Sequence, residues 1–217
     1  MRAPKILALL IGLFAAQPCQ AELLVDARSG RVLGSAIAIG GARLVTNRHV
    51  VEPALRAGRA VAVQQGEARL AVRVAAVSDR MDLALLVAAA TLAAQPVLRA
   101  LPPRRDGRVF ARTPAGATVA GSVAAFPWRD AWWPALFVRL AVGYGASGGA
   151  VTDEDGALVG MITAAVNPDA RQIQMLSSRA GALPRGAPRL SPPPTVLVLP
   201  IQAVLQEVAR LQALPGR

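Results

Sequence analysis

The chain has 217 residues, of which 53% are hydrophobic and 17% are charged, with 17 prolines and 19 glycines. This length suits one large domain or two small ones, and the apolar content excludes an intrinsically disordered chain. A collagen and a coiled coil are excluded because the sequence has neither a glycine triplet repeat nor a sustained heptad. The 24 basic and 13 acidic residues give a formal charge of +11, which raises the question of nucleic-acid binding. His49 is the only histidine and Cys19 is the only cysteine.

The first residues have the organisation of a secretory signal peptide. Arg2 and Lys5 precede the apolar run 6–16, and Ala21 supplies a small residue at the expected cleavage position. The run is too short to cross a bilayer, which requires about 20 apolar residues. A lipid anchor on Cys19 is the less favoured alternative, because a proline directly precedes it.

Removal of residues 1–21 leaves 22 basic and 13 acidic residues, a net charge of +9, and no cysteine. We therefore expect a secreted or periplasmic protein, with no stable membrane span after cleavage, no disulfide and no thiolate metal site. The arginines are scattered, and Arg104-Arg105 is the densest basic spot. No basic stripe interleaved with aromatic residues is present, so we expect no nucleic-acid partner.

From residue 23 onward, short apolar segments alternate with turn residues. A hairpin is predicted at 35–46, around Gly40-Gly41. Further strands are predicted at 60–63, 68–77, 83–87, 109–111, 135–140, 150–151 and 158–163. Short strands without long intervening helices indicate an all-β barrel or sandwich.

Three longer features complete the predicted organisation. Residues 101–107 resemble a linker between two β halves, and 167–195 form a long surface loop rich in proline, arginine and serine. Apolar residues at three- and four-residue steps after Pro200 predict an amphipathic helix over 200–213. The Trp128, Trp132 and Trp133 cluster is interpreted as a hydrophobic plug in the second half, with a substrate-contacting lip as the alternative.

Three segments concentrate polar residues that are suited to chemistry. A single histidine is often structural, but His49 is the one candidate for a base near neutral pH. Asp82 directly precedes an apolar strand, where a carboxylate can be held and aimed at an imidazole, whereas Asp79 lies in a polar turn. The third segment is the glycine-rich stretch 143–149, which contains Ser147.

The glycine-rich stretch fits three templates. The dinucleotide fingerprint is disfavoured, because no helix follows and no βαβ unit surrounds it. The nucleophile elbow of α/β-hydrolases is excluded, because no histidine follows Ser147. The subtilisin order would need an acid before the histidine, and Asp26, the only aspartate there, is expected in an exposed turn. The remaining template has the order His49, Asp82, Ser147, as in chymotrypsin-like enzymes.

The three polar segments and their order resemble those of a known enzyme family. Segments 46–51, 82–86 and 145–149 resemble the three active-site segments of trypsin-like serine proteases, and most closely those of the bacterial HtrA-type branch. Segments 156–163 and 198–201 are similar to the strand pair after the serine and to the closing element of that family. The resemblance covers about residues 30–213 and leaves no room for a PDZ domain.

The resemblance implies an all-β fold of two six-stranded barrels packed together, with a C-terminal helix. Residues 22–217 would form the protease domain, with a first barrel over about 22–100, a second over about 108–198 and the helix over about 200–213. It also implies an endopeptidase that needs no cofactor and no metal. The expected partner is a peptide or an unfolded protein, and the oligomeric state stays open.

The resemblance also assigns roles to individual residues. Ser147 would attack the scissile carbonyl, His49 would take its proton, and Asp82 would hold the imidazole and stabilise its charged form. The main-chain N–H groups of Gly145 and Ser147 would form the oxyanion hole. A catalytically silent, protease-like peptide-binding module is the alternative that the sequence leaves open.

Two departures from the digestive type of the family affect specificity and activation. Ala146 stands where those enzymes have an aspartate that pairs with a released N-terminus, so activation by that ion pair is not expected. Ala141 stands at the position that forms the base of the substrate pocket in the family, and the resemblance places Thr163 and Ala164 along the pocket wall. Without a carboxylate at that base, we expect cleavage after small or medium apolar residues rather than after lysine or arginine.

Overall fold

The computed structural model describes residues 21–92, 96–99, 103–124, 135–167, 172–175 and 195–214. Its first half forms a barrel whose strands follow one another in the order β1-β2-β3-β6-β5-β4, with β4 pairing back onto β1. The strands are β1 (Ala21–Asp26), β2 (Val32–Gly40), β3 (Arg43–Thr46), β4 (Val61–Gln65), β5 (Ala68–Val77) and β6 (Ala84–Ala88).

The predicted hairpin is confirmed as β2 and β3. Ile37 faces Val45 across the pair, and Gly40 and Gly41 both have positive φ values, 119° and 59°, in the turn. Glycine reaches such values without the steric cost that other residues incur, so the chain can reverse over two residues. The hairpin leads directly into α1 (Arg48–Arg56), the short helix that carries the single histidine.

The second half forms another closed ring of six strands, with β10 pairing onto both β7 and β11 to complete the order β10-β7-β8-β9-β13-β11. The seventh strand, β12, pairs with the far end of β11 outside this ring. The strands are β7 (Arg108–Arg112), β8 (Thr118–Ala124), β9 (Leu136–Arg139), β10 (Ala150–Thr152), β11 (Leu158–Asn167), β12 (Gln172–Met175) and β13 (Thr195–Pro200). The expected double-barrel, chymotrypsin-like fold is therefore confirmed.

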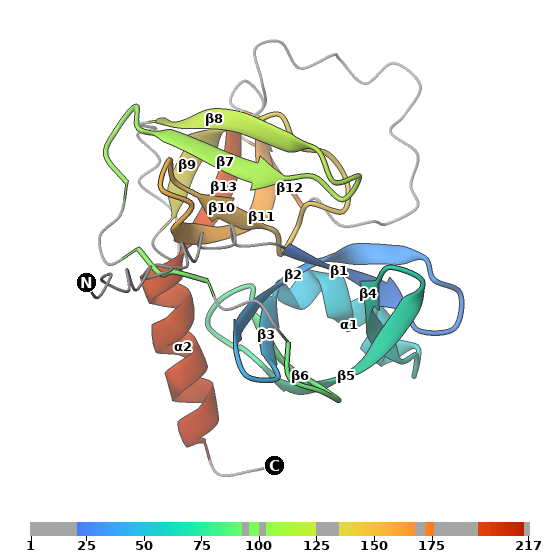
Figure 1. Cartoon of the computed structure of the whole chain (residues 1–217). Helices are drawn as coiled ribbons and strands as arrows, with labels where there is room; N and C mark the ends of the chain where they lie inside the picture. Colours follow the sequence, from blue (N-terminus) through green and yellow to red (C-terminus); the bar gives the residue numbers. More distant parts are fainter. Residues whose placement is uncertain are drawn as a thin grey trace, which may run out of the picture.

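The helix α2 (Ile201–Ala213) follows β13 and runs from the second barrel alongside the first (Figure 1). Its apolar face belongs to a buried cluster that also contains residues of both barrels. The members are Ile37, Val45, Leu83, Leu85, Ala150, Leu158, Met161, Leu199, Ile201, Val204, Val208 and Leu211. This third cluster lies between the separate interiors of the two barrels, so the barrels and α2 share one apolar joint.

Two local expectations are corrected. Asp26 itself is buried, although Arg28 and Ser29 in the turn after it are exposed as expected. It ends β1, is 3% exposed, accepts hydrogen bonds from Ser29 and forms an ion pair with Arg59. The pKa of Asp26 is lowered to about 2, mainly by the hydrogen bonds that the main-chain N–H and the hydroxyl of Ser29 donate to its carboxylate. Residues 48–56, for which no helix was expected, form α1.

Several predicted features fall outside the described residues. They are the signal peptide up to residue 20, the Trp128, Trp132 and Trp133 cluster, and residues 168–171 and 176–194 of the predicted loop. Inside that loop, the described residues 172–175 form β12. Within the described part of the chain, no helix has the length and apolar character required to cross a membrane.

Candidate active site

The three predicted catalytic residues meet where the two barrels face each other. His49 is the second residue of α1, and Asp82 lies between β5 and β6, so both come from the first barrel. Ser147 lies between β9 and β10 of the second barrel. Segments that are about 100 residues apart in the sequence are thus brought within hydrogen-bond distance.

The three side chains form one continuous hydrogen-bonded chain. His49 Nδ1 lies 2.7 Å from Asp82 Oδ2, and His49 Nε2 lies 3.0 Å from Ser147 Oγ. A carboxylate accepts hydrogen bonds only, so the imidazole proton sits on Nδ1 and Nε2 is left to accept the serine proton. Ser147 is fully buried, Asp82 is 8% exposed and the His49 side chain 15% exposed, so little water competes for these bonds.

Asp82 also holds the helix that carries its histidine. The main-chain N–H of His49 donates to Asp82 Oδ1 over 3.0 Å. The first N–H groups of a helix have no partner within it and form its positive end, so a carboxylate there is favourable. One carboxylate therefore fixes both the main chain and the ring of His49.

Two further residues, which sequence reasoning did not assign to the triad, complete the surroundings of Asp82. The Thr163 hydroxyl donates to Asp82 Oδ2 over 2.7 Å, and the Asn47 amide donates to Thr163 Oγ1 and to the Asp82 carbonyl, both over 3.0 Å. Thr163 lies at a register shift between β11 and β13, where a bulge re-aims a side chain. Asn47 occupies the N-cap of α1 but makes no capping bond, because its amide is directed inward.

These contacts keep Asp82 ionised. Burial by itself raises the pKa of this carboxyl group, but the hydrogen bond and charge of His49 and the hydrogen bond of Thr163 outweigh it. The pKa of Asp82 therefore lies below its usual range, and the carboxylate is negative at neutral pH.

The turn that carries Ser147 is held by β2 of the other barrel. Ser35 N–H donates to the Ser147 carbonyl over 2.7 Å, and the Ser35 hydroxyl donates to the Gly145 carbonyl over 2.8 Å. Gly145 and Gly148 have φ values of +85° and +82°, which favour glycine. A Cβ on Gly148 would collide with the Ser35 carbonyl oxygen, so glycine also permits this close approach of the two barrels.

The same turn presents two main-chain donors beside the serine. Among the described residues, neither the Gly145 N–H nor the Ser147 N–H donates a hydrogen bond, although both residues are buried. A buried N–H without a partner costs free energy, so such groups are usually paired in a folded protein. Two of them next to a buried serine hydroxyl form an arrangement suited to bind an oxygen that acquires negative charge.

The predicted substrate-pocket residues have different surroundings. Ala141 is exposed. The Thr163 side chain contacts Asp82, its carbonyl oxygen lies 3.3 Å from Ser147 Oγ, and Ala164 is fully buried. Ala164 packs in an apolar cluster with Ala124, Phe137 and Leu197. The two side chains expected on the pocket wall are thus engaged elsewhere, and a role for this segment in a substrate pocket stays a prediction.

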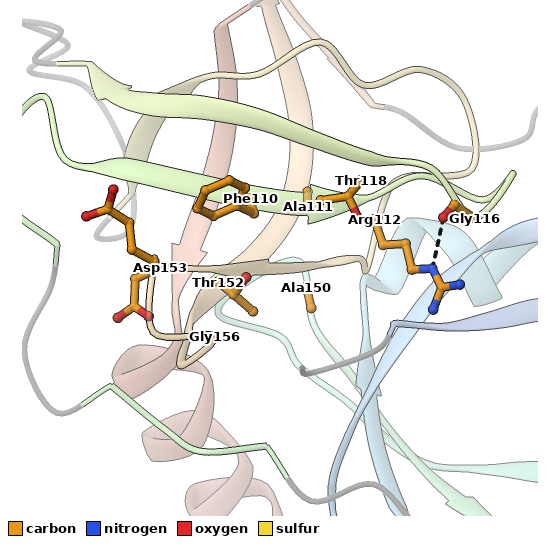
Figure 2. Close-up of a pocket in the computed structure, with 10 residues that line it drawn as sticks. Phe110, Ala111, Arg112, Gly116, Thr118, Ala150, Thr152, Asp153 and Gly156 are labelled. Atoms are coloured by element: carbon orange, nitrogen blue, oxygen red, sulfur yellow. Dashed lines mark hydrogen bonds between the residues drawn. The ribbon is translucent and has the colours of Figure 1, made fainter. Parts of the chain in front are cut away.

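A separate hollow lies on the second barrel, between β7, β8 and the turn after β10 (Figure 2). Its volume is about 390 Å³, and its lining includes Phe110, Thr118, Thr152 and Asp153. No lining residue belongs to the hydrogen-bonded chain of Ser147. Within the described residues, no group of three or more histidine, cysteine or acidic side chains is placed to hold a metal ion.

Comparison with solved structures finds the same fold in bacterial proteases. A serine-to-alanine mutant of Rv3671c from M. tuberculosis H37Rv, in its inactive form, has a TM-score of 0.65 at 19% identity, over 94% of this chain and 91% of that one. The active form of the same protease gives 0.64 at 20% identity, over 94% and 85%. The HtrA-type protease AlgW with a decapeptide gives 0.65 at 18% identity, over 91% of this chain and 65% of AlgW.

Comparison by sequence identifies a family but no individual curated relative. No curated protein matches the chain. The family model described as the trypsin-like peptidase domain matches residues 34–161, which include His49, Asp82 and Ser147 and make up more than half of the chain. The chain therefore belongs to the trypsin-like peptidase domain family.

Proposed function

We propose that the protein is a serine endopeptidase that hydrolyses peptide bonds through Asp82, His49 and Ser147. The observation that carries this proposal is the continuous hydrogen-bonded chain from Asp82 Oδ2 through the imidazole to Ser147 Oγ. Its order fixes the direction of proton transfer, because Nε2 is the acceptor that faces the serine hydroxyl.

In the first half of the reaction, Ser147 Oγ attacks the peptide carbonyl carbon while His49 Nε2 takes the hydroxyl proton. The carbonyl oxygen becomes negative and is bound by the N–H groups of Gly145 and Ser147, each worth about 2.7–4 kcal/mol. The imidazolium then gives its proton to the leaving amine, the C–N bond breaks, and the acyl group stays on Ser147. In the second half, water replaces the amine and the same proton transfers release the acid.

Asp82 supports both halves without itself becoming protonated. Its negative charge lies against the ring when the imidazole is positive, and its bonds to the ring and to the main chain of His49 keep Nε2 aimed at the serine. From the other side, Thr163 donates to the carboxylate, and Asn47 donates to Thr163 Oγ1 and to the main-chain carbonyl of Asp82.

The experiment that tests the function is labelling of the purified protein by a fluorophosphonate probe, together with hydrolysis of casein. We expect one label per chain on Ser147 and none on Ser147→Ala, while Ser122→Ala on β8 serves as the matched serine control and labels normally. A folded protein that neither labels nor cleaves would refute the enzyme and favour the silent peptide-binding module.

We further propose that the substrate is a peptide or an unfolded protein cleaved after small or medium apolar residues, as the alanine at position 141 suggests. Solved structures of AlgW, a protein of the same fold, contain a decapeptide and a tripeptide, which supports a peptide as substrate. Peptide libraries that vary the residue before the scissile bond test this preference, and faster cleavage after arginine would contradict it.

The location of the protein is a separate proposal. The basic start, the apolar run 6–16 and Ala21 support export to the periplasm or the medium. Fractionation of cells that express the full chain, with the N-terminus of the product sequenced, tests this. Recovery of the uncleaved chain in the cytosol would contradict it.

A further inference from the structure

Glu207 is a buried carboxylate that the proposed reaction does not use. It lies on α2 and is 6% exposed. Its neighbours on the helix, Val204, Val208 and Leu211, belong to the apolar joint between the barrels. A buried carboxylate in an apolar surrounding requires partners that compensate for the loss of water.

The partners of Glu207 lie on α2 itself and on the segment just before Asp82. The hydroxyl of Ser78 donates to Glu207 Oε1. The guanidinium of Arg210 donates to Oε2 over 2.8 Å and to Oε1 over 2.6 Å, and it also bonds Asp79 Oδ1 over 2.6 Å. The hydrogen bonds of Arg210 lower the pKa of Glu207 against the opposing effect of burial, and the charges of Arg210 and Arg80 contribute.

Ser78 closes a short loop over residues 78–83 through its hydrogen bonds. Its hydroxyl oxygen accepts the N–H groups of Arg80 and Met81, both over 3.0 Å, and its own N–H donates to the Leu83 carbonyl over 2.9 Å. With both of these acceptor bonds made, the hydroxyl proton is directed to Glu207. Asp82 lies inside this loop, so the position of its main chain depends on the bonds that close it.

We propose that Glu207 is a positioning residue of the active site, which acts through Ser78 to fix the loop that presents Asp82 to His49. The inference rests on the proposed function, because it concerns the triad. Asn47 holds the Asp82 carbonyl from the histidine side, and Glu207 holds the loop from the helix side. Glu207 thereby links the C-terminal helix to the loop that carries Asp82, although the two residues lie far apart in the sequence.

The test compares Glu207→Ala with Glu207→Gln, using the second-order rate of fluorophosphonate labelling between pH 5 and pH 9. The alanine variant loses the acceptor for Ser78, so we expect labelling about tenfold slower or more, as for other buried polar networks. We also expect the acid limb of its pH profile to move to lower pH, because a displaced Asp82 stabilises the protonated ring less. The amide oxygen of the glutamine variant still accepts from Ser78, so we expect most of the rate to return.

The control is Leu211→Ala, which weakens the packing of α2 in the same joint but leaves the polar contacts of Glu207 intact. We expect this variant to lower the melting temperature, to label within about twofold of the wild-type rate and to keep its acid limb. Wild-type labelling by a folded Glu207→Ala would overturn the proposal, as would a Leu211→Ala variant that reproduces both of its effects.

If Glu207→Ala does not fold, Ser78→Ala decides in the same assay. A folded Ser78→Ala with slow labelling and a displaced acid limb supports the proposal, and wild-type behaviour overturns it. Where both variants fold, the double variant should be no slower than the slower single one, because both act through one path. Absence of labelling in the wild-type protein would instead refute the proposed function, so the two failures are distinguishable.

Discussion

Substitution of Thr163 by valine tests whether the surroundings of Asp82 stabilise its charge. Valine has the same shape but lacks the hydroxyl that donates to Asp82 Oδ2 over 2.7 Å. A hydrogen bond to a charged group contributes about 1.5–3 kcal/mol, and we expect the free energy of unfolding at pH 7 to fall by that amount. If all of it is lost in the transition state, kcat/KM falls by about 10-fold to 150-fold at most.

The stability loss should depend on pH. The pKa of Asp82 is lowered in the folded protein, so its ionised form contributes stability above the ordinary aspartate pKa, and this contribution disappears as the pH falls. Urea denaturation of wild type and Thr163→Val, followed by far-ultraviolet circular dichroism at pH 7 and at pH 3, measures the difference.

The matched control is Thr46→Val, because the buried Thr46 hydroxyl donates to the neutral carbonyl of Ser35 over 2.6 Å. Loss of a neutral bond should cost about 0.5–1.5 kcal/mol, and the cost should be the same at both pH values. A Thr163→Val variant whose destabilisation is equally large at pH 3 would refute the idea that Thr163 stabilises the carboxylate.

Three further outcomes follow from the fold. Gly148→Ala should abolish fluorophosphonate labelling and lower the melting temperature, because the new Cβ would collide with the Ser35 carbonyl. Its control is Gly156→Ala, which has open space at the Cβ and should lower the melting temperature only slightly and label normally. Asp26→Asn should destabilise the protein at pH 7, and the gap in urea midpoint should close as the pH falls from about 4 toward 2; a gap that persists there would contradict the lowered pKa. Met161→Ala, in the joint between the barrels, should cost about 2–5 kcal/mol in urea denaturation, and a loss under 1 kcal/mol would show that the joint repacks.

Short apolar segments separated by turn residues were enough to predict an all-β barrel or sandwich, and the resemblance to trypsin-like proteases added the expectation of two barrels. The hairpin around Gly40 and the strand at 68–77 stand where the pattern indicates them. The helix α1 was missed because it has nine residues, contains Pro53, and has the β-branched pair Val50-Val51 in its first turn, all of which disfavour a helix locally. One of its first N–H groups is satisfied by Asp82, which lies 33 positions away, and no local pattern contains that bond.

The order of His49, Asp82 and Ser147 predicted which side chains meet, because few polar residues compete in an apolar chain. The residues that hold them were harder to identify. Asn47 was given no role of its own in the sequence. Thr163 was expected on a pocket wall, because the bulge that turns it toward Asp82 is a property of strand pairing. The burial of Glu207 could have been predicted from the sequence, because it lies three residues after Val204 and four before Leu211, on the apolar face of the helix.

The placement of His49, the proposed base, and Ser147, the proposed nucleophile, on different barrels has a consequence for how the proposed activity would arise during folding. Neither barrel contains a complete set of reacting groups, so a partly folded chain with one finished barrel cannot cleave itself or its neighbours. Return of labelling at Ser147 during refolding therefore reports the docking of the two halves and not the formation of either one. For a chain that crosses a membrane unfolded, hydrolytic activity would be confined to molecules that have completed assembly.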